Sequence, residues 1–180
     1  KEKIKKLAVP KNFVVLPGVK WLAARVPLYP LFIAAFLKFV SPSASAFIVA
    51  QAAVSTITVG VVYAITARIA GRGAAILAAA FCAFYPYSFV HDTTLQESAL
   101  YSCLSLISVW LLMVAFDKRK NLLFLLGGVL AGAATLTRAS HFLHAVFIAS
   151  LLLFLLRKDW KKALLFSGTF VLGLFICLSP

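Results

Sequence analysis

Long apolar runs without an interior charge constrain this chain more than any other feature. The runs lie at residues 44–69, 73–90, 98–116, 122–136, 142–156 and 163–178. A helix needs about 20 residues to cross the roughly 30 Å of hydrocarbon in a bilayer, and several runs are at or below the short limit. We therefore predict an all-α fold, a polytopic transmembrane helical protein with about six spans.

The composition excludes most other classes of protein. Apolar residues make up 63% of the 180 residues and charged residues 13%, whereas soluble domains average about 25% charged residues. A single soluble core cannot bury so many apolar side chains without leaving large exposed patches. Cys82, Cys103 and Cys177 lie inside apolar runs, so they are expected to be small buried hydrophobic residues.

The chain has a net charge of +13, and half of its 18 basic residues lie at three short connections. These nine residues lie at the ends of apolar runs or between them, at positions 68–72, 118–120 and 157–162. Such connections face the cytoplasm under the positive-inside rule. The alternate connections, at 91–97 and 137–141, contain Arg138 as their only basic residue, so we expect them to face outside. This placement indicates a membrane protein, and we expect no nucleic-acid partner.

The segment at residues 22–40 allows two interpretations. Its clean apolar stretch, residues 28–37, is too short to cross a bilayer, and Pro27 and Pro30 lie near its start. One interpretation is an interfacial helix over residues 27–40. The other is a short, tilted span from which Lys38 extends towards the membrane surface. Residues 1–24 form a basic segment whose structure the sequence does not indicate.

Polar residues are concentrated in the connections that we expect to face outside. They are His91, Asp92, Gln96, Glu97, Arg138, His141 and His144. Charged groups at a membrane boundary are costly unless they are solvated, paired or functional. One interpretation is a solvated loop in which Arg138 pairs with Glu97 or Asp92. The other is a polar site that faces outside and is bordered by the spans.

A metal site can also be drawn from these residues, although no dense ligand motif favours one. His141 and His144 are three residues apart and could share a helix face, and His91, Asp92 and Glu97 could supply further ligands. These ligands come from separate connections. A divalent metal therefore stays an alternative cofactor, and we assign no cofactor from the sequence.

Small residues in the run at 122–136 indicate close helix packing. Gly128 and Gly132 are four residues apart, and Ala131, Ala133 and Ala134 lie beside them. Small residues at this spacing let the backbones of two helices approach closely. We expect a helix crossing here.

Four stretches occur in an order that matches a known family. They are Arg-Val-Pro-Leu-Tyr-Pro-Leu at 25–31, Tyr-Ala-Ile-Thr-Ala-Arg-Ile-Ala-Gly at 63–71, Tyr-Pro at 85–86 with Leu-Gln-Glu-Ser-Ala-Leu at 95–100, and the glycine-rich stretch ending in Leu-Thr-Arg at 127–138. In this order the chain resembles the GT-C class of polytopic membrane glycosyltransferases. That class includes the dolichyl-phosphate-mannose protein mannosyltransferases and the aminoarabinose transferases. The resemblance covers residues 25–180 and implies part of the membrane module, with an interfacial helix before the spans.

The resemblance also implies a reaction and a set of partners. Members transfer a sugar from a polyprenyl-phosphate donor to an acceptor, here unknown, on the non-cytoplasmic face of the bilayer. Arg138 and Arg25 would bind the lipid phosphate, because a guanidinium offers a planar fork to phosphate oxygens. Glu97 matches the second acidic position of the family, which positions the acceptor or an arginine. The implied location is the plasma membrane of a prokaryote, with the site facing outside.

The chain departs from the family pattern at the principal catalytic acid. In the family this acid lies in a loop before the interfacial helix, whereas Glu2 is the only acidic residue before Arg25. We therefore expect a piece of a longer polypeptide and leave the catalytic residue open, with Glu97 and Asp92 as candidates. Two alternatives are a transporter or lipid-handling subunit that uses Asp92 and Glu97 as ion sites, and a non-catalytic scaffold with a membrane partner subunit.

Overall fold

The computed structural model describes residues 26–41, 43–86, 96–155 and 157–179, and this part of the chain is helical and contains no strand. The helices are α1 (Leu28–Phe39), α2 (Ala44–Ala83), α4 (Ser98–Lys118), α5 (Asn121–Thr135), α6 (His141–Leu155), a 3-10 turn (Arg157–Asp159) and α7 (Trp160–Leu178). Within the described residues, three helices are long and apolar enough to cross a membrane, at Ser45–Ala83, Ser98–Lys118 and Trp160–Leu178. The prediction of an all-helical membrane protein is confirmed.

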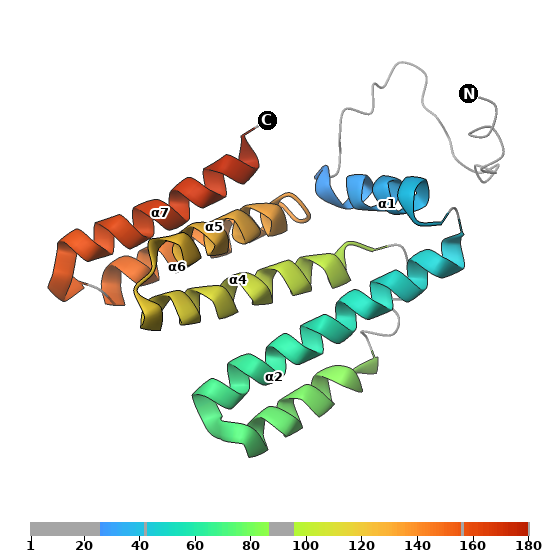
Figure 1. The fold of residues 1–180 in the computed structure, drawn as a ribbon, viewed down its shortest axis with the longest axis horizontal. Coiled ribbons are helices and arrows are strands. Elements are labelled where there is room, and N and C mark those ends of the chain that lie inside the picture. The colour runs from blue at the N-terminus through green and yellow to red at the C-terminus, as the bar shows by residue number, and fades with distance from the viewer. Residues whose placement is uncertain (1–25, 42, 87–95, 156, 180) are drawn as a thin grey trace.

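The long helix α2 reverses direction at Gly71, so it consists of two arms (Figure 1). Gly71 has φ 82° and ψ 174°, a backbone conformation that is essentially restricted to glycine. The two arms correspond to the separate apolar runs expected at residues 44–69 and 73–90. The second arm ends at Ala83, before Tyr85 and Pro86, because a residue that precedes proline disfavours the α conformation. Residues 87–90 lie outside the described residues.

The first arm of α2 runs along α4, with a polar contact to Gln96, just before α4, near one end and to α4 itself near the other. Near the start of the arm, the buried side chain of Gln51 donates a hydrogen bond from Nε2 to the carbonyl oxygen of Gln96, 2.9 Å away. Near the reversal, Arg68 forms an ion pair with Asp117 of α4. Polar contacts at two separated points define how the arm lies against α4.

The tightest packing lies between α5 and α7. A Cβ atom added at Gly128 would overlap the carbonyl oxygen of Phe170, and one at Gly132 would lie 2.7 Å from Cβ of Cys177. The close crossing expected from the glycine spacing is therefore present, with α7 as the partner helix. Further along, the buried rings of Phe124 and Phe166 stack with centroids 4.5 Å apart. This pair belongs to a core shared by α4, α5, α6 and α7.

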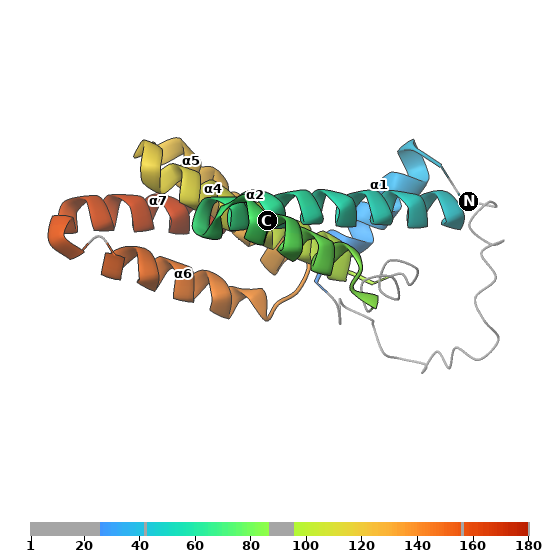
Figure 2. The same cartoon turned by 90° about the horizontal axis from the view of Figure 1, so that it is seen from below.

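Helix α1 crosses the end of the bundle obliquely, beside the start of α2 (Figure 2). Its rings Phe32 and Phe36 contact Phe47 of α2, with centroids 5.6 and 5.3 Å apart. The helix has 12 residues and is therefore about 18 Å long, well short of the hydrocarbon thickness.

The two ends of the bundle differ in the residues that they present. One end holds the reversal of α2, the connection from α4 to α5 and the connection from α6 to α7 (Figure 1). Nine of the 18 basic residues of the chain lie at these three places. The start of α4 and the loop from α5 to α6, which contain Glu97 and Arg138, lie at the opposite end near α1. The fold therefore separates the basic connections from the other polar residues.

Candidate functional site

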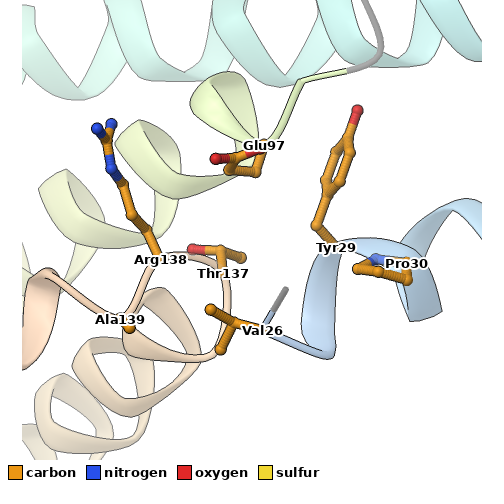
Figure 3. A pocket seen from close by; sticks show the side chains of 7 residues that line it. All are labelled: Val26, Tyr29, Pro30, Glu97, Thr137, Arg138 and Ala139. Atoms are coloured by element: carbon orange, nitrogen blue, oxygen red, sulfur yellow. The ribbon is translucent and has the colours of Figure 1, made fainter. Parts of the chain in front are cut away.

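A pocket of about 230 Å³ lies where α1, the start of α4 and the loop from α5 to α6 meet. Its lining residues are Val26, Tyr29, Pro30, Glu97, Thr137, Arg138 and Ala139. Glu97 and Thr137 lie between Arg138 on one side and Tyr29 on the other (Figure 3). The pocket thus combines one acidic, one basic and several apolar residues from three separate parts of the chain.

Backbone hydrogen bonds hold these three parts together. The N–H of Leu28, at the start of α1, donates to the carbonyl oxygen of Leu136 at 2.9 Å, which ties α1 to the end of α5. The hydroxyl of Thr137, whose side chain is buried, donates to the carbonyl oxygen of Ala134 at 2.6 Å. The N–H of Arg138 donates to the same carbonyl at 3.0 Å. The loop therefore continues the last turn of α5 and presents Arg138 at the pocket.

Glu97 and Arg138 line the pocket without forming an ion pair with each other. Among the described residues, the ion pairs are Arg68 with Asp117 and Lys162 with Asp159. Of the two partners considered for Arg138, Glu97 is therefore not paired with it, whereas Asp92 lies outside the described residues. The reason is the direction of the Arg138 side chain, whose guanidinium lies over the ring of Tyr101, 5.7 Å from its centroid.

His141 begins α6 directly after the Arg138 loop and is almost fully buried, with 2% of its surface exposed. Its Nδ1 lies 3.4 Å from the hydroxyl of Tyr101, and its ring meets the Tyr101 ring edge to face. The ring also stacks on His144. The start of α6 therefore places a buried imidazole against the hydroxyl of Tyr101.

Only some of the candidate site residues fall within the described part of the chain. Glu97 and Arg138 line the same pocket, and His141 follows the Arg138 loop at the start of α6. Arg25, His91 and Asp92 lie outside the described residues, and their expected roles remain predictions. Within the described ranges, no group of three or more His, Cys, Asp or Glu side chains is placed to bind a metal.

Sequence reasoning did not single out two aromatic residues at this site. Tyr29 is buried and lines the pocket, and Tyr101 lies under the guanidinium of Arg138. The available signals were the position of Tyr29 within the stretch at 25–31 and the spacing of Tyr101, one helical turn after Glu97. Neither signal distinguishes a site residue from an ordinary aromatic residue near a membrane surface.

Comparison with known protein families identifies the family to which the chain belongs. The sequence model of the dolichyl-phosphate-mannose-protein mannosyltransferase family matches residues 24–180. The chain belongs to this family. The match covers every described residue and the pocket. Neither a curated protein nor a solved structure matches the chain.

Membership in the mannosyltransferase family establishes the general class of protein. The family indicates a membrane glycosyltransferase of the GT-C type, in agreement with the helical fold and the apolar helices described above. The resemblance recognised from the four sequence stretches is thereby confirmed at the level of the family.

Proposed function

We propose that the pocket binds the phosphate of a polyprenyl-phosphate sugar and that the chain is part of the enzyme that transfers this sugar to an acceptor. The observation that supports the proposal is the presence of Arg138 at a pocket built within the matched family region. A guanidinium binds phosphate oxygens through two parallel hydrogen bonds. Arg25, near the start of the matched region, is proposed as a second phosphate ligand.

The size and lining of the pocket suit the polar end of such a donor. Its volume of about 230 Å³ is below the roughly 300–1,000 Å³ usual for whole small-molecule ligands. A phosphate with part of a sugar fits this space better than a complete lipid does. Val26, Pro30 and Ala139 give the pocket an apolar side. In the proposal the prenyl chain leaves along this side towards the bilayer.

Glu97 is proposed to position the acceptor. In the transfer step, an acceptor oxygen forms a bond to the anomeric carbon of the sugar, the bond from that carbon to the phosphate oxygen breaks, and the prenyl phosphate leaves. The acceptor proton must pass to a base. Glu97 is a carboxylate that lines the pocket, where it can accept a hydrogen bond from the acceptor hydroxyl. Asp92 is proposed as a second carboxylate for this role.

We also propose a six-span topology with the pocket on the non-cytoplasmic side. The two arms of α2 together with α4, α5, α6 and α7 would be the spans, and α1 would lie in the interface. The support is the position of the basic connections at the end of the bundle opposite to Arg138 and Glu97 (Figure 1). The plasma membrane of a prokaryote is the proposed location.

The donor is tested with farnesyl phosphate, a short prenyl phosphate, and with farnesol, which lacks the phosphate. Binding of each probe is measured by calorimetry on the full-length protein in nanodiscs. We expect farnesyl phosphate to bind more tightly than farnesol. Arg138→Ala should lower the affinity for farnesyl phosphate about ten- to hundredfold, because charged hydrogen bonds contribute about 1.5–3 kcal/mol. Farnesol binding should stay the same.

Other outcomes would favour a different function. Equal affinity for the two probes, or farnesyl phosphate binding that Arg138→Ala leaves unchanged, contradicts the proposed donor site. Binding without sugar transfer from any polyprenyl-phosphate sugar in a panel of donors would favour the scaffold alternative. Proton-coupled uptake that Glu97→Gln abolishes would favour a transporter.

A further inference from the structure

The side chain of Arg138 rests on an aromatic ring that does not line the pocket. Its guanidinium carbon lies 5.7 Å from the centroid of the Tyr101 ring, within the range of a cation–π contact. Arg138 itself is exposed and follows the last turn of α5. A long, exposed arginine samples many rotamers, so a ring beneath its head group restricts where the charge can lie. Tyr101 is therefore placed to limit the position of the phosphate-binding group.

The ring of Tyr101 is in turn held by His141. The Tyr101 hydroxyl lies 3.4 Å from Nδ1 of His141, and the two rings meet edge to face with centroids 5.3 Å apart and an interplanar angle of 82°. His141 is 2% exposed, and its Nε2 is buried without a hydrogen-bond partner among the described residues. Nδ1, which faces Tyr101, is therefore the ring nitrogen with a polar contact. An imidazole buried in this way provides a rigid support for the tyrosine.

The same turn of α4 also supplies Glu97 to the pocket. Tyr101 follows Glu97 by four residues, and its N–H donates to the carbonyl oxygen of Glu97 at 2.9 Å. Residues at this spacing lie on one face of a helix. The backbone N–H of His141 donates to the carbonyl oxygen of Arg138 at 3.0 Å, so the loop and the support are linked as well. The position of Arg138 relative to Glu97 is thus defined by contacts with one helical turn.

We propose that Tyr101 and His141 are positioning residues that hold the guanidinium of Arg138 at the pocket for a phosphate ligand. The inference rests on the proposed function, in which Arg138 binds the donor phosphate. Neither residue need touch the ligand. Their effect is to reduce the conformational freedom that Arg138 loses on binding, which raises affinity without a new contact.

The first test replaces the ring. Binding of farnesyl phosphate and of farnesol is measured with the full-length protein in nanodiscs for Tyr101→Leu and for Tyr63→Leu, the same change at an exposed tyrosine of α2. We expect Tyr101→Leu to weaken farnesyl phosphate binding about three- to tenfold, in line with the strength of a cation–π contact. Farnesol binding should not change, and Tyr63→Leu should bind both probes like the wild type. A residue that only maintains the fold would lower the affinity for both probes.

The second test replaces His141, which contacts the ring and hydroxyl of Tyr101. His141→Leu removes the group that contacts the Tyr101 hydroxyl, whereas His141→Asn keeps a polar atom close to the position of Nδ1. We expect His141→Leu to lower the affinity for farnesyl phosphate by a factor similar to that of Tyr101→Leu, and His141→Asn to restore most of it. Equal affinity in the Leu and Asn variants would overturn the role of His141.

The outcomes separate this inference from the proposed function. If Arg138→Ala weakens farnesyl phosphate binding and Tyr101→Leu does not, the donor site stands and the positioning role is wrong. If Arg138→Ala has no effect, the donor site itself is wrong, whatever the Tyr101 variants do. If Tyr101→Leu lowers the affinity for farnesol as much as for farnesyl phosphate, the tyrosine is structural and the positioning role is rejected.

Discussion

Glu97 and Arg138 line one pocket from two separate elements, yet their side chains form no ion pair with each other. A direct pair would largely neutralise both charges. In the observed arrangement, the carboxylate and the guanidinium can instead each contact a different part of a ligand. A phosphate with an adjacent hydroxyl-bearing group is a ligand of this kind, which is why the pair supports a glycosyl-transfer site.

The first prediction separates the roles of these two residues. Arg138→Ala should raise the KM for the prenyl-phosphate sugar, because it removes a phosphate ligand. Glu97→Gln should lower kcat by about tenfold or more, because the lost carboxylate contact contributes about 1.5–3 kcal/mol. Steady-state kinetics on the full-length protein with a labelled donor measure both constants.

The matched control for that prediction is Lys162→Ala, which removes a basic residue at the opposite end of the bundle. This variant should have the kinetic constants of the wild type. Wild-type kinetic constants in both Arg138→Ala and Glu97→Gln would show that these residues do not act in the reaction.

The second prediction concerns the sides of the membrane. Ser140 and Lys120 are both exposed, and they lie in connections at opposite ends of the bundle. In a protein whose native cysteines have been replaced, Ser140→Cys should react with an impermeant maleimide added outside sealed cells. Lys120→Cys should react only after permeabilisation. The reverse pattern would place the pocket on the cytoplasmic side.

The third prediction tests the crossing of α5 and α7. Gly128→Ala should lower the free energy of unfolding by about 1–3 kcal/mol, because the new methyl group overlaps the carbonyl oxygen of Phe170 and forces the backbones apart. Gly60→Ala is the control, since nothing lies within 4 Å of a Cβ at that position. Unfolding in detergent measures both variants. Equal stability of the two would contradict the close crossing.

The fourth prediction tests the reversal of α2. Gly71→Ala should cost about 1–3 kcal/mol of unfolding free energy, because its φ of 82° is strained for any residue with a Cβ. Gly73→Ala is two residues away and also has open space around its Cβ, but it lacks the positive φ. It should be neutral or stabilising by up to about 1 kcal/mol. A similar effect of the two substitutions would argue against a sharp reversal at Gly71.

The helical class and the close packing at Gly128 could be predicted because both depend on local patterns. Apolar runs and small-residue spacing are properties of a continuous stretch of chain. The reversal at Gly71 was expected only as a boundary between two runs, since a glycine can equally lie inside a helix. Glu97, one of the two partners considered for Arg138, does not pair with it, because opposite charges in nearby loops do not define side-chain directions.

The helical membrane class, the membership in the mannosyltransferase family and the gathering of nine of the 18 basic residues in three connections could all be inferred from the sequence. These properties follow from composition and order along the chain, and tertiary contacts do not change them. The pairing of Gly128 with α7, the lining of the pocket by α1 and the place of Tyr101 beneath Arg138 depend instead on the folded bundle. Each of these requires residues that are distant in the sequence to meet, and their meeting depends on packing over the whole bundle.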